Sequence, residues 1–280
     1  MIPTLNPVTT GFHVPFIDFL DAASKAGFPA IEYSIEPFAK VATDQSESAA
    51  IELLTSRQLQ LGSFMLPTEF RKDEQTFQEQ LKELPKFAAL ARKLGTDRCC
   101  TWQLPSTDEP VAAYTSRMIR RLREIAKILD DYGIRFGIEW VGPKTMRTMK
   151  NDFIYDIPGA LEFVDAIDVK NVGLLFDSFH WFTSHATIED ILHLTEQQIV
   201  LVHINDAPNL PKDEQIDTQR LLPGEGIIDL QGMLDALRQI GYNHCIAVET
   251  FGEELPKMNP VDAAMKTKAA VDQVLSLNVK

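Results

Sequence analysis

The chain of 280 residues has few cysteines, no long apolar run and no excess of positive charge. Three cysteines, Cys99, Cys100 and Cys245, make no disulfide framework, and the adjacent pair lies in an apolar run typical of a buried strand. The absence of a stretch of about 18 apolar residues excludes a membrane-spanning helix. The beginning, MIPTLNPVTTGF, lacks the basic-then-apolar pattern of a signal peptide, so we expect a cytoplasmic protein.

The charge balance is acidic. There are 27 lysines and arginines against 40 aspartates and glutamates, a net charge of −13. Such a protein does not concentrate polyanions, so we expect neither nucleic acid nor a membrane surface as a partner. The segment 117–123, RMIRRLR, holds four arginines. A local basic groove is one reading of it, and we favour the other, the solvated face of an amphipathic helix.

Short β-type runs alternate with helical patterns along the whole chain, and no linker separates two parts. The predicted strands are residues 3–9, 30–35, 59–66, 98–104, 134–141, 172–176, 199–205 and 245–251. This alternation predicts an α/β fold, a single-domain (β/α)8 TIM barrel over residues 1–280. A doubly wound open sheet is the competing arrangement, but no GxGxxG follows the first strand.

The predicted helices are residues 15–27, 46–58, 73–95, 111–133, 157–167, 187–195, 229–241 and 259–277. Four of them end on a glycine just before the next strand, in KAGF, KLGT, DYGI and QIGY. Pro85 predicts a kink in the segment 73–95.

The last four predicted strands end in a potential ligand. In IRFGIEW, VGLLFD, IVLVHIN and CIAVET the large apolar residues fall on one set of alternating positions. We expect the large apolar set, which includes Val200, to face the surrounding helices. The other set should fill the barrel interior, and in each strand it ends in a potential ligand: Glu139, Asp177, His203 and Glu249. These four should point inward at the carboxyl ends of the strands, where barrel enzymes build their sites.

Three carboxylates in a half-buried space would repel one another, and a divalent cation removes that cost. Three carboxylates and one imidazole suit Zn, Mn, Co or Mg, so we predict one such ion. Taken singly, each residue has a plainer explanation: Asp177 could cap a helix, and His203 could be a core histidine. Four residues in the same register make the metal site the better explanation.

Further candidates surround these four. His180, on the loop after Asp177, and Arg220 could bind the hydroxyl and oxyanion oxygens of a polyol. Asp206 could orient His203, contact substrate or begin a loop. Aromatic residues at strand ends, Trp102 and Trp140 with Trp181 and Phe64, could wall a sugar pocket or serve as ordinary packing, and His13 could approach from the first loop.

The motifs GIEWVG, NVGLLFDSFH, LVHINDA, RLLPGEGIID and AVETF together resemble the xylose isomerase-like barrel superfamily of sugar isomerases and epimerases, and within it the inosose isomerases of inositol catabolism. The resemblance implies metal ligands at Glu139, Asp177, His203 and Glu249. It also implies substrate contacts from His180 and Arg220. The two glutamates would be the catalytic acid/base pair, Glu249 being the preferred base. The implied reaction is isomerisation or epimerisation of a keto-polyol or ketose by proton transfer through a metal-bound cis-enediolate.

Four alternatives stay open. A ketose 3-epimerase would share the site, and a hydride shift would need a second metal. An abasic-site endonuclease of the same superfamily would need three metals and more histidines than LQLGSFML and RCCTWQLP offer. A non-catalytic sugar-binding barrel should lack one of the two glutamates. A homo-oligomer is compatible with the sequence.

Overall fold

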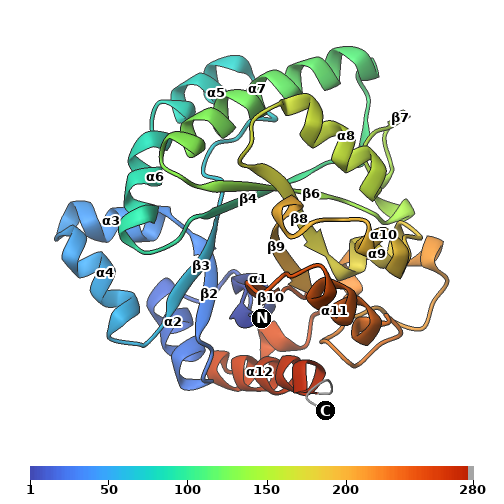
Figure 1. The fold of residues 1–280 in the computed structure, drawn as a ribbon. Coiled ribbons are helices and arrows are strands. Elements are labelled where there is room, and N and C mark those ends of the chain that lie inside the picture. The colour runs from blue at the N-terminus through green and yellow to red at the C-terminus, as the bar shows by residue number, and fades with distance from the viewer. Residues whose placement is uncertain (277–280) are drawn as a thin grey trace.

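Eight parallel strands close into a barrel in the computed structural model, which describes residues 1–276 (Figure 1). Their order around the barrel is β1-β10-β9-β8-β6-β4-β3-β2. This confirms the predicted (β/α)8 fold. The strands are β1 (Ile2–Leu5), β2 (Ala30–Ser34), β3 (Gln60–Met65), β4 (Arg98–Gln103), β6 (Arg135–Trp140), β8 (Val172–Asp177), β9 (Ile199–Ile204) and β10 (Cys245–Val248). Two further strands, β5 (Ser106–Thr107) and β7 (Asn151–Asp152), pair antiparallel outside the barrel.

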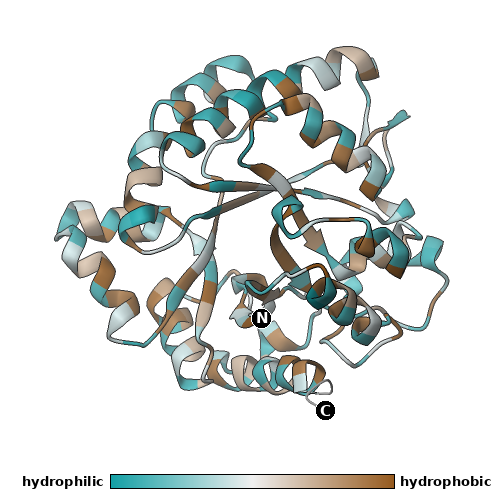
Figure 2. Cartoon of the chain, viewed as in Figure 1, coloured by the Kyte–Doolittle hydropathy of each residue, from teal (hydrophilic) through white to brown (hydrophobic). Residues whose placement is uncertain are grey.

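Helices surround the barrel, with hydrophobic residues mixed among hydrophilic ones on each helix (Figure 2). The longer ones are α2 (Phe16–Lys25), α3 (Glu36–Asp44), α4 (Glu47–Thr55), α5 (Glu74–Leu81), α6 (Leu84–Lys93), α7 (Val111–Asp131), α8 (Ile157–Ile167), α11 (Leu230–Gln239) and α12 (Pro260–Ser276). The short ones are α1 (Pro7–Thr10), α9 (Ser178–Thr183) and α10 (Ile188–Leu192), and 3-10 turns η1 to η5 occupy Lys144–Met146, Glu196–Gln198, Lys212–Glu214, Asp217–Gln219 and Leu255–Lys257. No helix within residues 1–276 combines the length and the apolar character needed to cross a membrane.

The predicted helix ends agree with the structure. Gly27, Gly95, Gly133 and Gly241 have φ of +77°, +90°, +65° and +91°, a region that favours glycine. Instead of a kink there is a break: α5 ends at Leu81, α6 begins at Leu84, and Pro85 lies in the first turn of α6, where its missing N–H has no intrahelical partner to lose. The last residue of the predicted helix 259–277 lies outside the described residues.

The predicted strands 3–9 and 245–251 were too long, and three helices were missed: α1 and α9 near the site, and α3 after β2. Residues 7–10 form α1, because the Asn6 side chain accepts from the Val8 N–H and Pro7 starts the helix. Strand β10 ends at Val248, so Glu249 lies just beyond it. Helix α9 places His180 on a helix instead of a loop, and α3 was not predicted.

All four arginines of the segment 117–123 form hydrogen bonds or ion pairs with other groups of the protein. Arg121 is buried, with its guanidinium bound to the carbonyls of Phe70 and Lys72 and to Glu74. Arg123 donates to the carbonyls at the end of α8. Arg117 and Arg120 pair with Glu109 and Glu74. The helix interpretation is therefore correct, although Arg121 is a buried structural residue instead of a solvated one.

A small apolar cluster fills the barrel below the site: Ala30, Cys100, Leu175, Val200, Leu201 and Cys245. The three cysteines are free and buried. Val200 lies inside, which corrects its predicted outward position, because the β8–β9 register shifts and Val200 is the extra residue between Ile199 and Leu201. A side chain on Gly137 would meet the Cys100 sulfur at 3.0 Å, so this glycine makes room for the cluster.

Candidate metal centre

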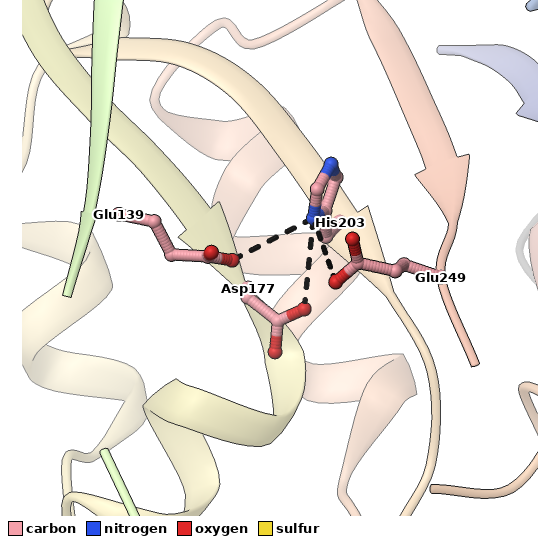
Figure 3. Close-up of side chains that lie close together, drawn as sticks. All are labelled: Glu139, Asp177, His203 and Glu249. Carbon is pink, nitrogen blue, oxygen red and sulfur yellow. Dashed lines mark ion pairs between the residues drawn. The ribbon is translucent and has the colours of Figure 1, made fainter. Parts of the chain in front are cut away.

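Four ligand atoms converge at the carboxyl ends of neighbouring strands, as the alternation predicts (Figure 3). Glu139 ends β6, Asp177 ends β8, His203 lies in β9, and Glu249 follows β10. One atom from each of the four lies within 4.8 Å of all the others. The Nδ1 atom of His203 is central, at 3.6 Å from Glu139 Oε1, 3.9 Å from Asp177 Oδ2 and 3.3 Å from Glu249 Oε2. Within residues 1–276 this is the one such group of three or more His, Cys, Asp or Glu side chains.

The orientation of His203 depends on a residue that the sequence reasoning missed. Glu32, fully buried on β2, accepts from His203 Nε2 at 2.8 Å. Asn6 donates from Nδ2 to the same Glu32 oxygen at 2.9 Å and to Glu249 Oε1 at 3.3 Å. Period-two alternation in AIEYS already places Ala30, Glu32 and Ser34 on the inward side, and this signal could have identified Glu32.

Asp177 has two separate functions. Its Oδ1 atom accepts from the backbone N–H groups of Phe179 and His180, at 2.7 and 3.0 Å, and caps α9. Its Oδ2 atom faces the cluster and accepts from Asn205 Nδ2 at 2.9 Å. The helix cap is therefore confirmed, and the same side chain is still a candidate ligand.

Burial and mutual charge set the protonation of the cluster. Burial raises the pKa of Glu139 to about 8. Burial would also raise the pKa of Glu249, but His203 and Arg220 lower it to about 2. Burial opposes the charged form of His203, yet the carboxylates of Glu249 and Glu32 hold its pKa well above the usual value. A divalent cation at this place would favour the carboxylate form of Glu139.

The residues fit a divalent cation. His203 Nδ1 and Glu139 Oε1 are buried and have no hydrogen-bond partner in the protein, which is costly for polar atoms. Both atoms face the same space as Asp177 Oδ2 and Glu249 Oε2. Three oxygens and one imidazole nitrogen are ligands suited to Zn, Mn, Co or Mg.

Arg220 and His180 lie beside the cluster, as expected from the sequence, and Asp217 joins them. Arg220 NH1 donates to Asp177 Oδ2 and Glu249 Oε2, each at 2.9 Å. Its Nε and NH2 donate to Asp217 Oδ1, and NH2 lies 3.1 Å from His180 Nε2. Burial lowers the pKa of His180, so the ring is neutral near pH 7. The guanidinium is therefore fixed on all sides by protein groups.

Asp206 holds a loop instead of His203 or a substrate. Its carboxylate accepts four backbone N–H groups, from Ala207 and Ile228 on Oδ1 and from Gly224 and Gly226 on Oδ2. This arrangement closes the segment that carries Asp217 and Arg220. Of the meanings considered for Asp206, the loop is the one that the contacts support.

A cavity of about 310 Å³ opens above the cluster. Its polar lining includes Glu139, Glu249, His180, Arg220, Glu32 and Asp217, and its apolar lining includes Phe12, Met65, Trp102, Val141, Met146 and Phe251. Trp102 is thus part of the wall, 38% exposed, with the Arg71 guanidinium 4.1 Å from its ring centre.

The other three aromatic candidates and His13 do not line the cavity. Trp140 is buried on the opposite face of β6 from Glu139 and packs on Phe176, with ring centres 5.5 Å apart. This corrects its predicted place in the wall, because neighbours in a strand face opposite ways. Phe64 and Trp181 are core residues, and His13 is not part of the lining.

Comparison with known proteins gives one consistent family. The family model described as xylose isomerase-like TIM barrel matches residues 20–272. The inosose isomerase of Bacillus velezensis is 29% identical over 206 residues, 73% of this chain and 71% of that protein. The D-psicose 3-epimerase of Enterocloster bolteae is 22% identical over 246 residues, 83% of this chain and 76% of that protein.

Solved structures agree in fold over almost the entire chain. A xylose isomerase domain protein from Alicyclobacillus acidocaldarius superposes with a TM-score of 0.92 at 30% identity, covering 99% of both chains. The IOLI protein, solved with a bound zinc atom, gives a TM-score of 0.84 at 25% identity, again over 99% of both.

Proposed function

The chain belongs to the xylose isomerase-like TIM barrel family, and from that premise we propose that it is a divalent-metal-dependent isomerase or epimerase of a keto-polyol or ketose, similar to the inosose isomerases. The observation that carries the proposal is the convergence of Glu139, Asp177, His203 and Glu249 within 4.8 Å. The ion would be Zn, Mn, Co or Mg. The proposal includes a cytoplasmic location and one domain over residues 1–280.

A divalent cation held by these four residues supplies Lewis acidity toward a substrate carbonyl and the hydroxyl beside it. The remaining chemistry is proton transfer by the two glutamates. Glu249 is the base that takes the proton from carbon, since His203 and Arg220 stabilise its ionised form. Glu139, the other glutamate of the cluster, is its partner in the proton transfer.

The neighbours of the glutamates orient the substrate. The neutral ring of His180 lies with Nε2 3.8 Å from Glu139 Oε1, and an oxygen between His180 and the cluster would contact both. Arg220 adds a fixed positive charge beside the negative charge that develops on the substrate oxygens. Proton return to the neighbouring carbon gives isomerisation, and return to the opposite face of the same carbon gives epimerisation.

The first test is the metal content of protein purified without chelators or an affinity tag that binds metal. We expect one equivalent per chain by plasma mass spectrometry, and its loss in His203→Ala and Glu249→Gln. No bound ion, even after incubation with Zn, Mn or Co, would refute the proposal. About three equivalents would instead support the nuclease, which the acidic charge and the presence of one such cluster among residues 1–276 disfavour.

The second test separates the candidate reactions. Turnover of keto-inositols and ketohexoses in deuterated water should give product labelled at the reacting carbon. Unlabelled product at partial conversion would point to a hydride shift. Turnover of a ketohexose with inversion at carbon 3 would favour the 3-epimerase alternative, which the similarity to the D-psicose 3-epimerase supports.

A further inference from the structure

We propose that Glu32 is a positioning residue that fixes the ring of His203 and thereby sets the affinity of the metal centre; this inference rests on the proposed function. Glu32 is part of the cavity lining but makes no hydrogen bond to Glu139, Asp177 or Glu249. Its Oε2 atom contacts His203 Nε2 at 2.8 Å and Asn6 Nδ2 at 2.9 Å, and its Oε1 atom has no hydrogen-bond partner in the protein.

The placement of Glu32 follows from the strand that carries it. On β2, Ala30 lies in the interior cluster and Ile31 in the outer core, so Glu32 points inward. The β2–β3 register shifts between Ile31 and Glu32, opposite the extra residue Gly62. The extra residue belongs to β3, so the alternation along β2 is undisturbed and Glu32 keeps its inward position. Its carboxylate meets a ring that is 171 residues away in the sequence.

A fully buried carboxylate is costly unless it is paired and hydrogen-bonded. Here the pairing selects one state of His203. A carboxylate only accepts, so it requires the proton on Nε2, and a cation that binds the neutral ring would meet the lone pair on Nδ1. That atom faces three carboxylate oxygens at 3.3–3.9 Å, where a cation is the partner that suits all four atoms.

Asn6 holds the carboxylate in place from the other side. Its Oδ1 accepts from the Val8 N–H at 3.0 Å, which fixes which way the amide faces. Its Nδ2 is then directed to Glu32 Oε2 and Glu249 Oε1. The segment after β1 therefore keeps Glu32, His203 and Glu249 in one hydrogen-bonded chain. Partners of this type beyond the ligands typically contribute a factor of about 10–100 to metal affinity.

The test is zinc affinity, measured by competition with a chromogenic chelator on the full chain. Glu32→Gln keeps the shape but offers an amide, which no longer requires the proton on Nε2 and has lost the charge. We expect zinc binding about 10–100-fold weaker, with kcat at saturating zinc much less affected. Glu36→Gln is the matched control, since Glu36 is exposed four residues further on, and its affinity should equal that of the wild type.

A second measurement needs no variant, so it decides the question even if Glu32→Gln does not fold. Nitrogen–proton correlation spectra of the histidine rings in zinc-loaded wild type should show one ring bound through Nδ1 with a slowly exchanging proton on Nε2. A ring bound through Nε2, or unchanged affinity in folded Glu32→Gln, would overturn the role of Glu32. If the wild type binds none of zinc, manganese and cobalt, the proposed function itself is refuted.

Discussion

Replacing Asp206 with asparagine should destabilise the loop that carries Asp217 and Arg220. The carboxylate is 1% exposed and accepts four backbone N–H groups at 2.9–3.0 Å. An amide keeps one accepting oxygen and turns a donor toward the other pair of N–H groups. Two charge-assisted hydrogen bonds are then lost, and the amide donor faces two N–H donors.

The expected cost is about 3–6 kcal/mol, from two bonds of about 1.5–3 kcal/mol each. A typical domain has a free energy of unfolding of about 5–15 kcal/mol, so the effect should be large. Urea unfolding followed by circular dichroism measures it. Amide hydrogen exchange at Gly224, Gly226 and Ile228 should show that protection is lost in this loop first.

Asp168→Asn is the matched control. Asp168 is exposed at the end of α8 with φ of +57°, a conformation that asparagine adopts as readily, so we expect a change below about 0.5 kcal/mol. If Asp206→Asn unfolds within about 1 kcal/mol of the wild type, the backbone N–H groups do not depend on the carboxylate, and the reasoning is wrong.

Three further predictions concern the barrel and its cavity. Gly137→Ala should lower the free energy of unfolding by about 1–3 kcal/mol, because its methyl group would lie 3.0 Å from the Cys100 sulfur; an unchanged melting curve would contradict this. Trp102→Leu should raise KM more than it lowers kcat, whereas Trp140→Leu should reduce stability and leave KM near the wild-type value; steady-state kinetics and melting curves separate the two. Removing the ion with a chelator should lower Tm, and zinc at 100 times its Kd should restore about 2.7 kcal/mol of stability; an unchanged Tm in both conditions would show that the ion does not bind the folded state preferentially.

The sequence predicted the convergence of the four candidate ligands because two simple rules apply to them. Alternation with period two decides which residues point inward, and parallel strands bring their carboxyl ends to one face. Glu139 and Asp177 follow both rules within regular strands, and His203 follows them beyond the register shift in β9. The same rules should have excluded Trp140, which directly follows Glu139, and they could have included Glu32.

What the sequence could not predict are contacts between loops and departures from regular geometry. Asp217 reaches Arg220 from a 3-10 turn, a type of segment that has no apolar periodicity. The register shift at β9 moves Val200 inward, and nothing in IVLVHIN marks it. Helix α9 has six residues, too few for a helical pattern to be distinguished from a loop.

Asp177 joins the end of β8 to α9, so the position of the cluster and the position of His180 both depend on this one residue. A shift of the strand end would move the oxygen that faces His203 and the helix that bears His180 together. We therefore expect substitutions in the outer loops to leave the distance between His180 and the cluster unchanged. Substitutions of Phe12 or Met146, which line the cavity, should change which molecules the cavity accepts and keep the spacing of the candidate catalytic groups. Directed evolution of substrate range could therefore begin at these two positions.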